Sequence, residues 1–161
     1  EAAARNRQLP ALSALQQWAQ NQGNAALAST CQRFAQETQS GTSRTLPGPT
    51  GERNVYTLAP RAHVLCLATS VNDLLVQTAA VLQDNVLTDA SVALDAVLHH
   101  GDGQALQAVC TALAQRPGPI VGVTAMQPGA VDIPLERLLI ERALSVNTAA
   151  AGGNASLMTL G

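Results

Sequence analysis

Lysine is absent from this sequence of 161 residues, and all nine of its basic residues are arginine. This absence excludes the lysine of a phosphate-binding P-loop and every mechanism that forms a Schiff base on lysine. Aromatic residues are almost as scarce, with one tryptophan, one tyrosine and one phenylalanine. The chain therefore lacks the stacking platform that single-stranded nucleic acid requires. Its formal net charge of −2 also provides no electrostatic attraction for nucleic acid.

Charged residues are few as well. They make up 12% of the chain, about half the share of an ordinary globular protein. One interpretation is that another module covers part of the surface, since a free monomer normally carries more charge. The alternative is an alanine-rich composition, which inflates the hydrophobic share of 47%. The composition alone leaves both interpretations open.

Cys31, Cys66 and Cys110 lie far apart in apolar stretches, and no CxxC pair occurs. We expect all three to be unpaired, buried small hydrophobes, with Cys110 on the inward face of a helix. A disulfide framework is not expected, which favours a reducing compartment. No signal peptide and no apolar run of about 18 residues is present. Because the first residue is Glu1, we expect the sequence to be a piece of a longer protein.

The N-terminal part of the chain predicts a helical hairpin. Apolar residues recur at helical spacing over 9–22 and again over 24–39, and Gly23 separates the two stretches. Asn24 suits the N-cap of the second helix. The stretch 41–53 contains two prolines and three glycines and therefore predicts a loop.

From residue 54 onward, short apolar runs alternate with helical periodicity. The expected strands are 54–58, 63–68, 95–99, 119–126 and 135–148, and the expected helices are 70–82 and 102–115. Ser70 with Asp73 resembles a capping box at the start of the first of these helices. This alternation predicts a parallel sheet with right-handed crossovers, in which VLCLA is buried on both faces. The fold class is α/β: a Rossmann-like parallel sheet with flanking helices, preceded by a helical hairpin and followed by an extended β tail. We expect the chain to divide into 1–40, 41–134 and 135–161.

The stretch 82–95 is short for its place in this pattern. A strand and a helix normally occupy this part of an α/β unit. We therefore expect about 20–40 residues to be missing here. In that case two consecutive Cα atoms would lie much further apart than the roughly 3.8 Å of a trans peptide.

Candidate chemistry gathers where the strand 95–99 ends. His99 and His100 fall where open α/β sheets bind ligands, and Asp102 and Cys110 follow them. Adjacent strand residues point to opposite faces, so the two histidines cannot share a metal ion. Asp102 is better suited to capping the next helix. These residues therefore predict a capped strand end.

Two further motifs have ordinary structural interpretations. The sequence GDG at 101–103 is a fragment of a dinucleotide-binding loop, and its aspartate disfavours pyrophosphate. Glutamate–arginine pairs at 136–137 and 141–142 are typical of a solvated face, with salt bridges to a neighbour as the alternative. We therefore predict no catalytic, cofactor-binding or metal-binding residue in this chain.

Three stretches resemble the C-terminal region of long-form proline utilisation A, a bifunctional bacterial flavoenzyme that converts proline to glutamate. They are LPGPTGERNVYTLAPRAHVLCLA (46–68), DAVLHHGD (95–102) and ERLLIERALSVNTAAAGGNASLMTLG (136–161), and the similarity spans 7–161. The resemblance implies an aldehyde-dehydrogenase-like domain without the catalytic nucleophile. It also implies a terminal tail motif that covers the neighbouring dehydrogenase module and helps to close an internal channel.

The resemblance further implies a parent enzyme with FAD-dependent proline dehydrogenase and NAD-dependent L-glutamate γ-semialdehyde (pyrroline-5-carboxylate) dehydrogenase activities. FAD and NAD would belong to the parent, and this segment would bind neither. Its partners would be the aldehyde-dehydrogenase and proline-dehydrogenase modules of the same polypeptide, in a homo-oligomer. The implied location is the bacterial cytoplasm, with peripheral attachment to the inner membrane.

The tail supplies the expected interface, because its apolar residues have no helix or strand period that would bury them locally. The expected interface residues are Ser145, Val146, Asn147, Thr148, Gly152, Gly153, Asn154, Ser156, Leu157 and Met158. Two hypotheses compete at this point. The first is a non-catalytic interaction domain, and the second is an independent nucleotide-binding or oxidoreductase domain. A weaker third is a structural oligomerisation module.

Overall fold

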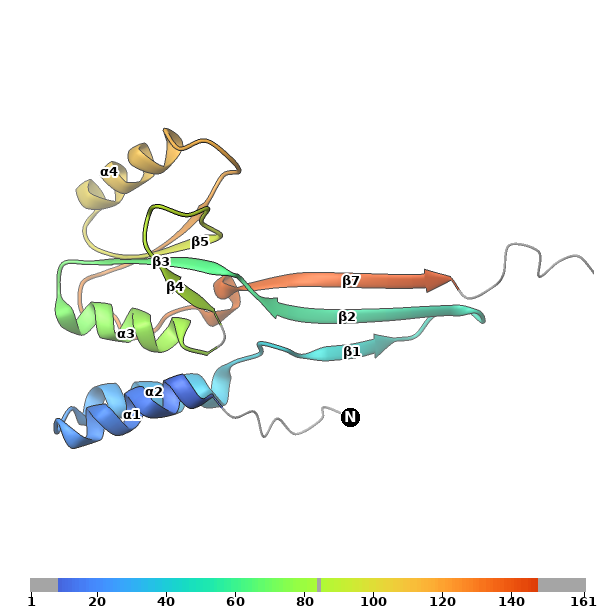
Figure 1. Cartoon of the computed structure of the whole chain (residues 1–161), viewed down its shortest axis with the longest axis horizontal. Helices are drawn as coiled ribbons and strands as arrows, with labels where there is room; N and C mark the ends of the chain where they lie inside the picture. Colours follow the sequence, from blue (N-terminus) through green and yellow to red (C-terminus); the bar gives the residue numbers. More distant parts are fainter. Residues whose placement is uncertain (1–8, 84, 148–161) are drawn as a thin grey trace, which may run out of the picture.

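Two separate sheets organise the chain (Figure 1). The computed structural model describes residues 9–83 and 85–147. Its helices are α1 (Pro10–Asn21), α2 (Ala25–Glu37), α3 (Val71–Val81), α4 (Gly103–Ala114) and the short 3₁₀ helix η1 (Leu135–Leu138). Its strands are β1 (Ser43–Leu46), β2 (Glu52–Pro60), β3 (His63–Ala68), β4 (Val86–Thr88), β5 (Ala96–His100), β6 (Gly122–Met126) and β7 (Leu139–Asn147).

The helical hairpin is present as predicted. Gly23 turns the chain with a φ of 70°, and the Asn24 side chain accepts a hydrogen bond of 3.0 Å from the backbone N–H of Leu27. These two residues end α1 and begin α2, because glycine tolerates positive φ and asparagine is a favoured N-cap. Phe34 and Cys31 of α2 are fully buried and join the continuous core beneath α3.

The parallel sheet confirms the α/β fold class. Its strand order is β4-β3-β5-β6, and every neighbouring pair is parallel. In Figure 1, α3 lies on one side of this sheet with α1 and α2 beyond it, and α4 lies on the other side. Ser70 caps α3 and Asp102 caps α4, as the sequence predicts. A sheet flanked by helices on both sides is the Rossmann-like arrangement.

The second sheet corrects the prediction of a loop over 41–53. Ser43–Leu46 forms β1 and pairs with β2 in antiparallel register, and β2 pairs in turn with β7. The irregular part shrinks to the hairpin tip, where Gly51 has a φ of 85° and Glu52 N–H donates to Pro49 O over 3.0 Å. The prolines and glycines therefore form a turn between strands, and backbone pairing with β2 holds β1 in place.

Smaller differences concern how deeply elements are buried. The VLCLA run in β3 is buried at Val64 and half-buried elsewhere, so the prediction of burial on both faces is wrong. Helix α4 has no fully buried residue, although its predicted inward residues Leu106, Val109 and Leu113 are half-buried. The predicted strand over 135–148 begins with η1 and continues as β7 to Asn147.

Candidate interaction site

The three-stranded sheet β1-β2-β7 projects away from the helices, with no helix over its outer part (Figure 1). The strand register sorts its side chains onto two faces. Ile140, Leu144 and Val146 of β7 share one face with their partners Ala59, Val55 and Arg53 of β2. Leu144 is 60% exposed and Val146 is 41% exposed. These exposed apolar residues, with Val55 and Ile140 beside them, form what we call the apolar stripe.

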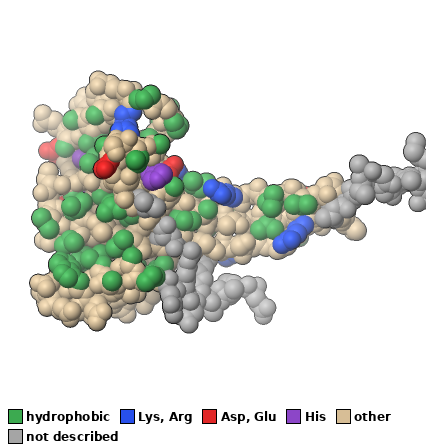
Figure 2. All heavy atoms as spheres, viewed as in Figure 1, with side chains coloured by type: hydrophobic (Ala, Val, Ile, Leu, Met, Phe, Trp, Pro, Cys, Tyr) green, Lys and Arg blue, Asp and Glu red, His purple; other side chains and the backbone are tan. Residues whose placement is uncertain are grey.

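Arginine side chains border the apolar stripe. Arg53 pairs with Val146 across the strands, and Arg142 pairs with Thr57 on the same face. Neither guanidinium forms an ion pair within residues 9–83 and 85–147. Figure 2 shows hydrophobic side chains on the projecting sheet between basic ones. A surface that combines exposed aliphatic groups with unpaired arginines fits an apolar partner with an acidic rim.

The opposite face of the projecting sheet carries more polar side chains, with Leu46 of β1 exposed beside them. Ser145 Oγ donates a hydrogen bond of 2.9 Å to Glu52 Oε1. A side-chain hydrogen bond with Glu141 raises the pKa of the Tyr56 hydroxyl above its ordinary value. These polar groups form hydrogen bonds with one another across neighbouring strands. Exposure to solvent therefore costs them less free energy than it costs the side chains of the apolar stripe.

The predicted interface residues divide into two groups. Ser145, Val146 and Asn147 lie in β7 and pair with Asn54, Arg53 and Glu52. The strand predicted over 135–148 already contained these three residues and is confirmed, whereas their contact with another module stays a prediction. They form an ordinary antiparallel ladder with β2 because the stretch 52–60 is itself extended. The others lie outside the described residues: Thr148, Gly152, Gly153, Asn154, Ser156, Leu157 and Met158.

The two histidines at the end of β5 point to opposite faces, as predicted. His100 is buried and faces α3, where Gln77 Nε2 lies 2.8 Å from His100 Nδ1. The same amide nitrogen donates to Leu67 O over 3.0 Å, so it is the NH₂ group that faces the ring. Nδ1 therefore accepts, and His100 Nε2 donates to Ala130 O over 2.8 Å. Both ring nitrogens are used in structural hydrogen bonds.

Carboxylates occupy the helix N-termini that would meet a bound phosphate. Asp102 Oδ1 accepts from Ala105 N–H over 2.8 Å at the start of α4. Buried Asp73, in the first turn of α3, accepts from Gly129 N–H over 2.9 Å. A helix N-terminus attracts anions; the Asp102 carboxylate already caps α4, and the Asp73 carboxylate adds a negative charge in the first turn of α3. The arrangement disfavours a dinucleotide.

Comparison with known proteins agrees with these features. No protein-family model matches the chain. The bifunctional protein PutA of Salmonella typhimurium is 48% identical over 183 residues, which cover 95% of this chain and 14% of that protein. The chain corresponds to one segment of PutA. PutA of Rhizobium meliloti is 32% identical and covers 94% of the chain. The chain thus spans about a seventh of the length of the curated PutA proteins it matches.

A solved PutA structure has the same fold. PutA from Corynebacterium freiburgense matches 91% of the chain with a TM-score of 0.53 and 14% identity, and the match covers 15% of that structure. The alignment with the Salmonella PutA runs over more positions than the 161 residues of this chain, so that PutA has residues without a counterpart here. Their placement at 82–95 stays a prediction.

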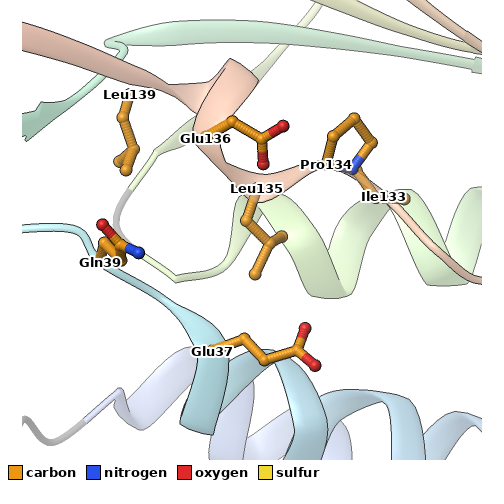
Figure 3. A pocket seen from close by; sticks show the side chains of 7 residues that line it. All are labelled: Glu37, Gln39, Ile133, Pro134, Leu135, Glu136 and Leu139. Carbon is orange, nitrogen blue, oxygen red and sulfur yellow. The ribbon is translucent and has the colours of Figure 1, made fainter.

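A small pocket lies where the projecting sheet of this PutA segment joins its helices (Figure 3). Leu135 points from η1 toward α2, and Glu37 and Glu136 contribute two carboxylates to the lining. Its volume of about 160 Å³ is smaller than the roughly 300 Å³ at which small-molecule sites begin. Within the described residues, no group of three His, Cys, Asp or Glu side chains could hold a metal ion.

The predictions that the cysteines of the PutA segment are unpaired and buried are confirmed only in part. All three are unpaired. Cys31 is buried, and Cys66 is partly buried, with burial raising the pKa of its thiol to about 12. Cys110 is exposed, so the prediction that it is buried is wrong. It lies on α4, which packs only loosely on the sheet.

No helix in the described part of the chain is long and apolar enough to cross a membrane.

Proposed function

We propose that this chain is a non-catalytic domain of a bifunctional proline-catabolic enzyme that oxidises proline to glutamate. In that enzyme it packs on the aldehyde-dehydrogenase module and helps to seal the substrate channel. The observation that carries this proposal is the apolar stripe on the projecting sheet. The use of His100, Asp73 and Asp102 in structural hydrogen bonds supports the non-catalytic part of the proposal.

The apolar stripe favours a partner on energetic grounds. Burying a Val, Leu or Ile side chain contributes about 1.5–3 kcal/mol relative to leaving it in water. Leu144 and Val146 are exposed and Ile140 is half-buried, so a partner surface gains several such contributions. A three-stranded sheet that is open to solvent also lacks the packed layer that normally stabilises sheets of this size. Docking supplies that layer.

The free edge of β7 is a second surface at which a partner can bind. Within the described residues, β7 pairs with β2 along one edge, and its other edge carries no partner strand. An unpaired edge accepts an added strand through backbone hydrogen bonds. We propose that the aldehyde-dehydrogenase module meets both this edge and the apolar stripe, and that Arg53 and Arg142 face acidic groups at its rim.

The remaining features of the proposed parent enzyme follow the family. FAD would serve the proline-dehydrogenase module and NAD the aldehyde-dehydrogenase module, and neither would bind this domain. The parent would be a homo-oligomer of the bacterial cytoplasm that attaches peripherally to the inner membrane. The two catalytic modules of the same polypeptide would be the partners of this domain.

A pair of substitutions in the full-length enzyme tests the docking proposal. Leu144→Asp places a charge in the middle of the apolar stripe, whereas Ala143→Asp places the same charge on the opposite face of the same strand. We expect Leu144→Asp to lower the coupled conversion of proline to glutamate by about tenfold, the equivalent of about 1.4 kcal/mol at the interface. NADH formation from added proline measures this rate.

Ala143→Asp is the matched control and should keep at least half of the coupled rate. Circular dichroism of both variants should match the parent, since both sites are exposed. Equal losses in the two variants would contradict docking through the apolar stripe, as would full activity of Leu144→Asp.

The alternative function, an independent nucleotide-binding or oxidoreductase domain, predicts that the isolated chain binds NAD. A ligand at a hundredfold excess over its Kd stabilises a protein by about 2.7 kcal/mol, which raises the melting temperature measurably. We expect no change in melting temperature with millimolar NAD, because carboxylates occupy the N-termini of α3 and α4. A clear rise would favour the alternative and contradict the proposed non-catalytic role.

A further inference from the structure

The connection between β4 and β5 is too short for the crossover it makes. In the strand order β4-β3-β5-β6, these two parallel strands lie on opposite sides of β3, so the chain must pass over β3 to join them. The residues available run from Asp89 to Asp95. A crossover between parallel strands ordinarily needs a dozen or more residues and is usually a helix. In this chain an irregular loop replaces that helix.

Hydrogen bonds place this loop on the α4 side of the sheet. Arg116, just beyond the end of α4, donates to Ala90 O over 2.5 Å and to Val92 O over 2.7 Å. The right-handed rule for crossovers predicts the same side. The connection from β4 to β5 and the connection from β5 to β6 run in the same direction across the sheet, so both lie on the side that α4 occupies. The α4 side is therefore the side that a crossover helix between β4 and β5 would cover.

The two sides of the sheet are packed very differently. On the α3 side, Val64, Ala96, Leu98 and Met126 are buried and belong to the continuous hydrophobic core, with Cys66 packed against it. The α4 side contributes none of its sheet residues to this core, although Val97 is buried. Its half-buried sheet residues include Leu65, Leu67 and Val123, which the strand register places beside Val97 and His99. The α4 side is thus apolar and incompletely covered.

His99 adds an independent sign that a neighbour is absent from this side. It is 4% exposed, and its Nδ1 is buried without a hydrogen-bond partner among the described residues. His100, one residue later, uses both ring nitrogens on the α3 side. Buried polar atoms in native proteins almost always have a partner. The unpartnered atom lies on the same side as the shortened crossover, because adjacent strand residues face opposite sides.

The comparison with PutA shows that a relative has additional residues, which could cover this side. The Salmonella PutA aligns over 183 residues with a chain of 161, so residues are present in that relative without a counterpart here. We infer that the α4 side of the parallel sheet is a docking surface for one amphipathic helix, which longer PutA chains supply from additional residues between β4 and β5. The apolar face of that helix covers Leu65, Leu67 and Val97, and it brings a polar group to His99. This inference does not depend on the proposed function.

Grafting tests this assignment on the isolated chain. The additional Salmonella residues are inserted between Thr88 and Ala96 in place of the short loop. The matched control is a Gly/Ser insertion of the same length. We expect the graft to raise the melting temperature by about 5–10 °C, while the Gly/Ser insertion leaves it unchanged or lowers it slightly, since a longer flexible loop costs closure entropy.

A thiol on the sheet reports directly on coverage of the surface. In a background that carries Cys66→Ala and Cys110→Ala and keeps the buried Cys31, Leu67→Cys places a thiol on the α4 side. The graft should slow its reaction with a thiol reagent by about tenfold, because the thiol becomes buried, while the Gly/Ser control should not. If the graft fails to fold, the same helix added as a synthetic peptide should protect this thiol in the original chain. A native graft or peptide that protects no better than Gly/Ser overturns the inference. The inference is also overturned if the original chain has the mass of a dimer and the Val123→Arg substitution makes it a monomer. A second copy of the chain would then be the occupant of this side.

Discussion

Deleting residues 145–161 from the full-length enzyme is expected to lower the coupled conversion of proline to glutamate by about tenfold or more. The deletion removes the exposed Val146 from the apolar stripe and shortens the free edge of β7 that we propose as the docking edge. It also removes the tail motif, whose Leu157 and Met158 have no local period that would bury them. Each lost apolar contact costs about 1.5–3 kcal/mol of interface energy, so two or three exceed the 1.4 kcal/mol that corresponds to tenfold.

A shorter deletion separates the tail from the strand. Removing 148–161 leaves β7 whole, so any loss of coupled rate in that variant comes from the tail motif alone. Both deletions should leave hydrogen exchange over 9–42 and 61–126 unchanged, because the continuous core lies around α2, α3 and the parallel sheet, whereas the longer deletion also removes the strand partners of residues 52–54. Full coupled activity in both deletions would remove the tail and the end of β7 from the proposed interface. Unfolding of 9–126 would show that these residues act on stability.

The sequence predicted the features of the fold that depend on a single residue or on its near neighbours in the chain. Asn24, Ser70 and Asp102 each cap a helix as expected, because capping depends on a side-chain oxygen and a backbone N–H three residues later. The parallel strands β3, β5 and β6 were also predictable as short apolar runs between turn residues, whereas the three-residue β4 was not predicted. His99 and His100 point to opposite faces for the same local reason, the two-residue period of a strand.

The errors concern features that depend on distant partners. β1 has no hydrophobic alternation of its own and exists because the register with β2 satisfies its backbone. The strand predicted over 135–148 had no predicted partner strand, and the structure pairs its end at Ser145–Asn147 with Glu52–Asn54. Cys110 has helical neighbours that suggest burial, yet α4 lies over the incompletely covered side of the sheet. Whether a surface is covered depends on what else the chain brings to it, which local pattern does not encode.

Replacing His100 with leucine is expected to lower the free energy of unfolding by about 2–4 kcal/mol. His100 lies in β5 and forms two hydrogen bonds to other parts of the fold. One is with Gln77 of α3, and the other is with Ala130 in the segment after β6. Leucine has a similar volume but leaves the half-buried Ala130 carbonyl without its hydrogen bond, which costs part of the desolvation of that group. Urea unfolding of the isolated chain, followed by circular dichroism, measures the change.

The neighbouring histidine is the matched control. His99→Leu also removes a buried imidazole from β5, but the Nδ1 atom of His99 has no partner within the described residues, so this substitution should change stability by less than about 1 kcal/mol. Equal losses in the two variants would mean that packing volume, and not the hydrogen bonds of His100, sets the effect. The distinction bears on function, because the segment that His100 holds at Ala130 leads through η1 into β7. Asp73 holds the same segment at Gly129. A loss of stability in His100→Leu that is accompanied by faster hydrogen exchange over 127–138 would show that this buried histidine fixes the base from which the projecting sheet extends.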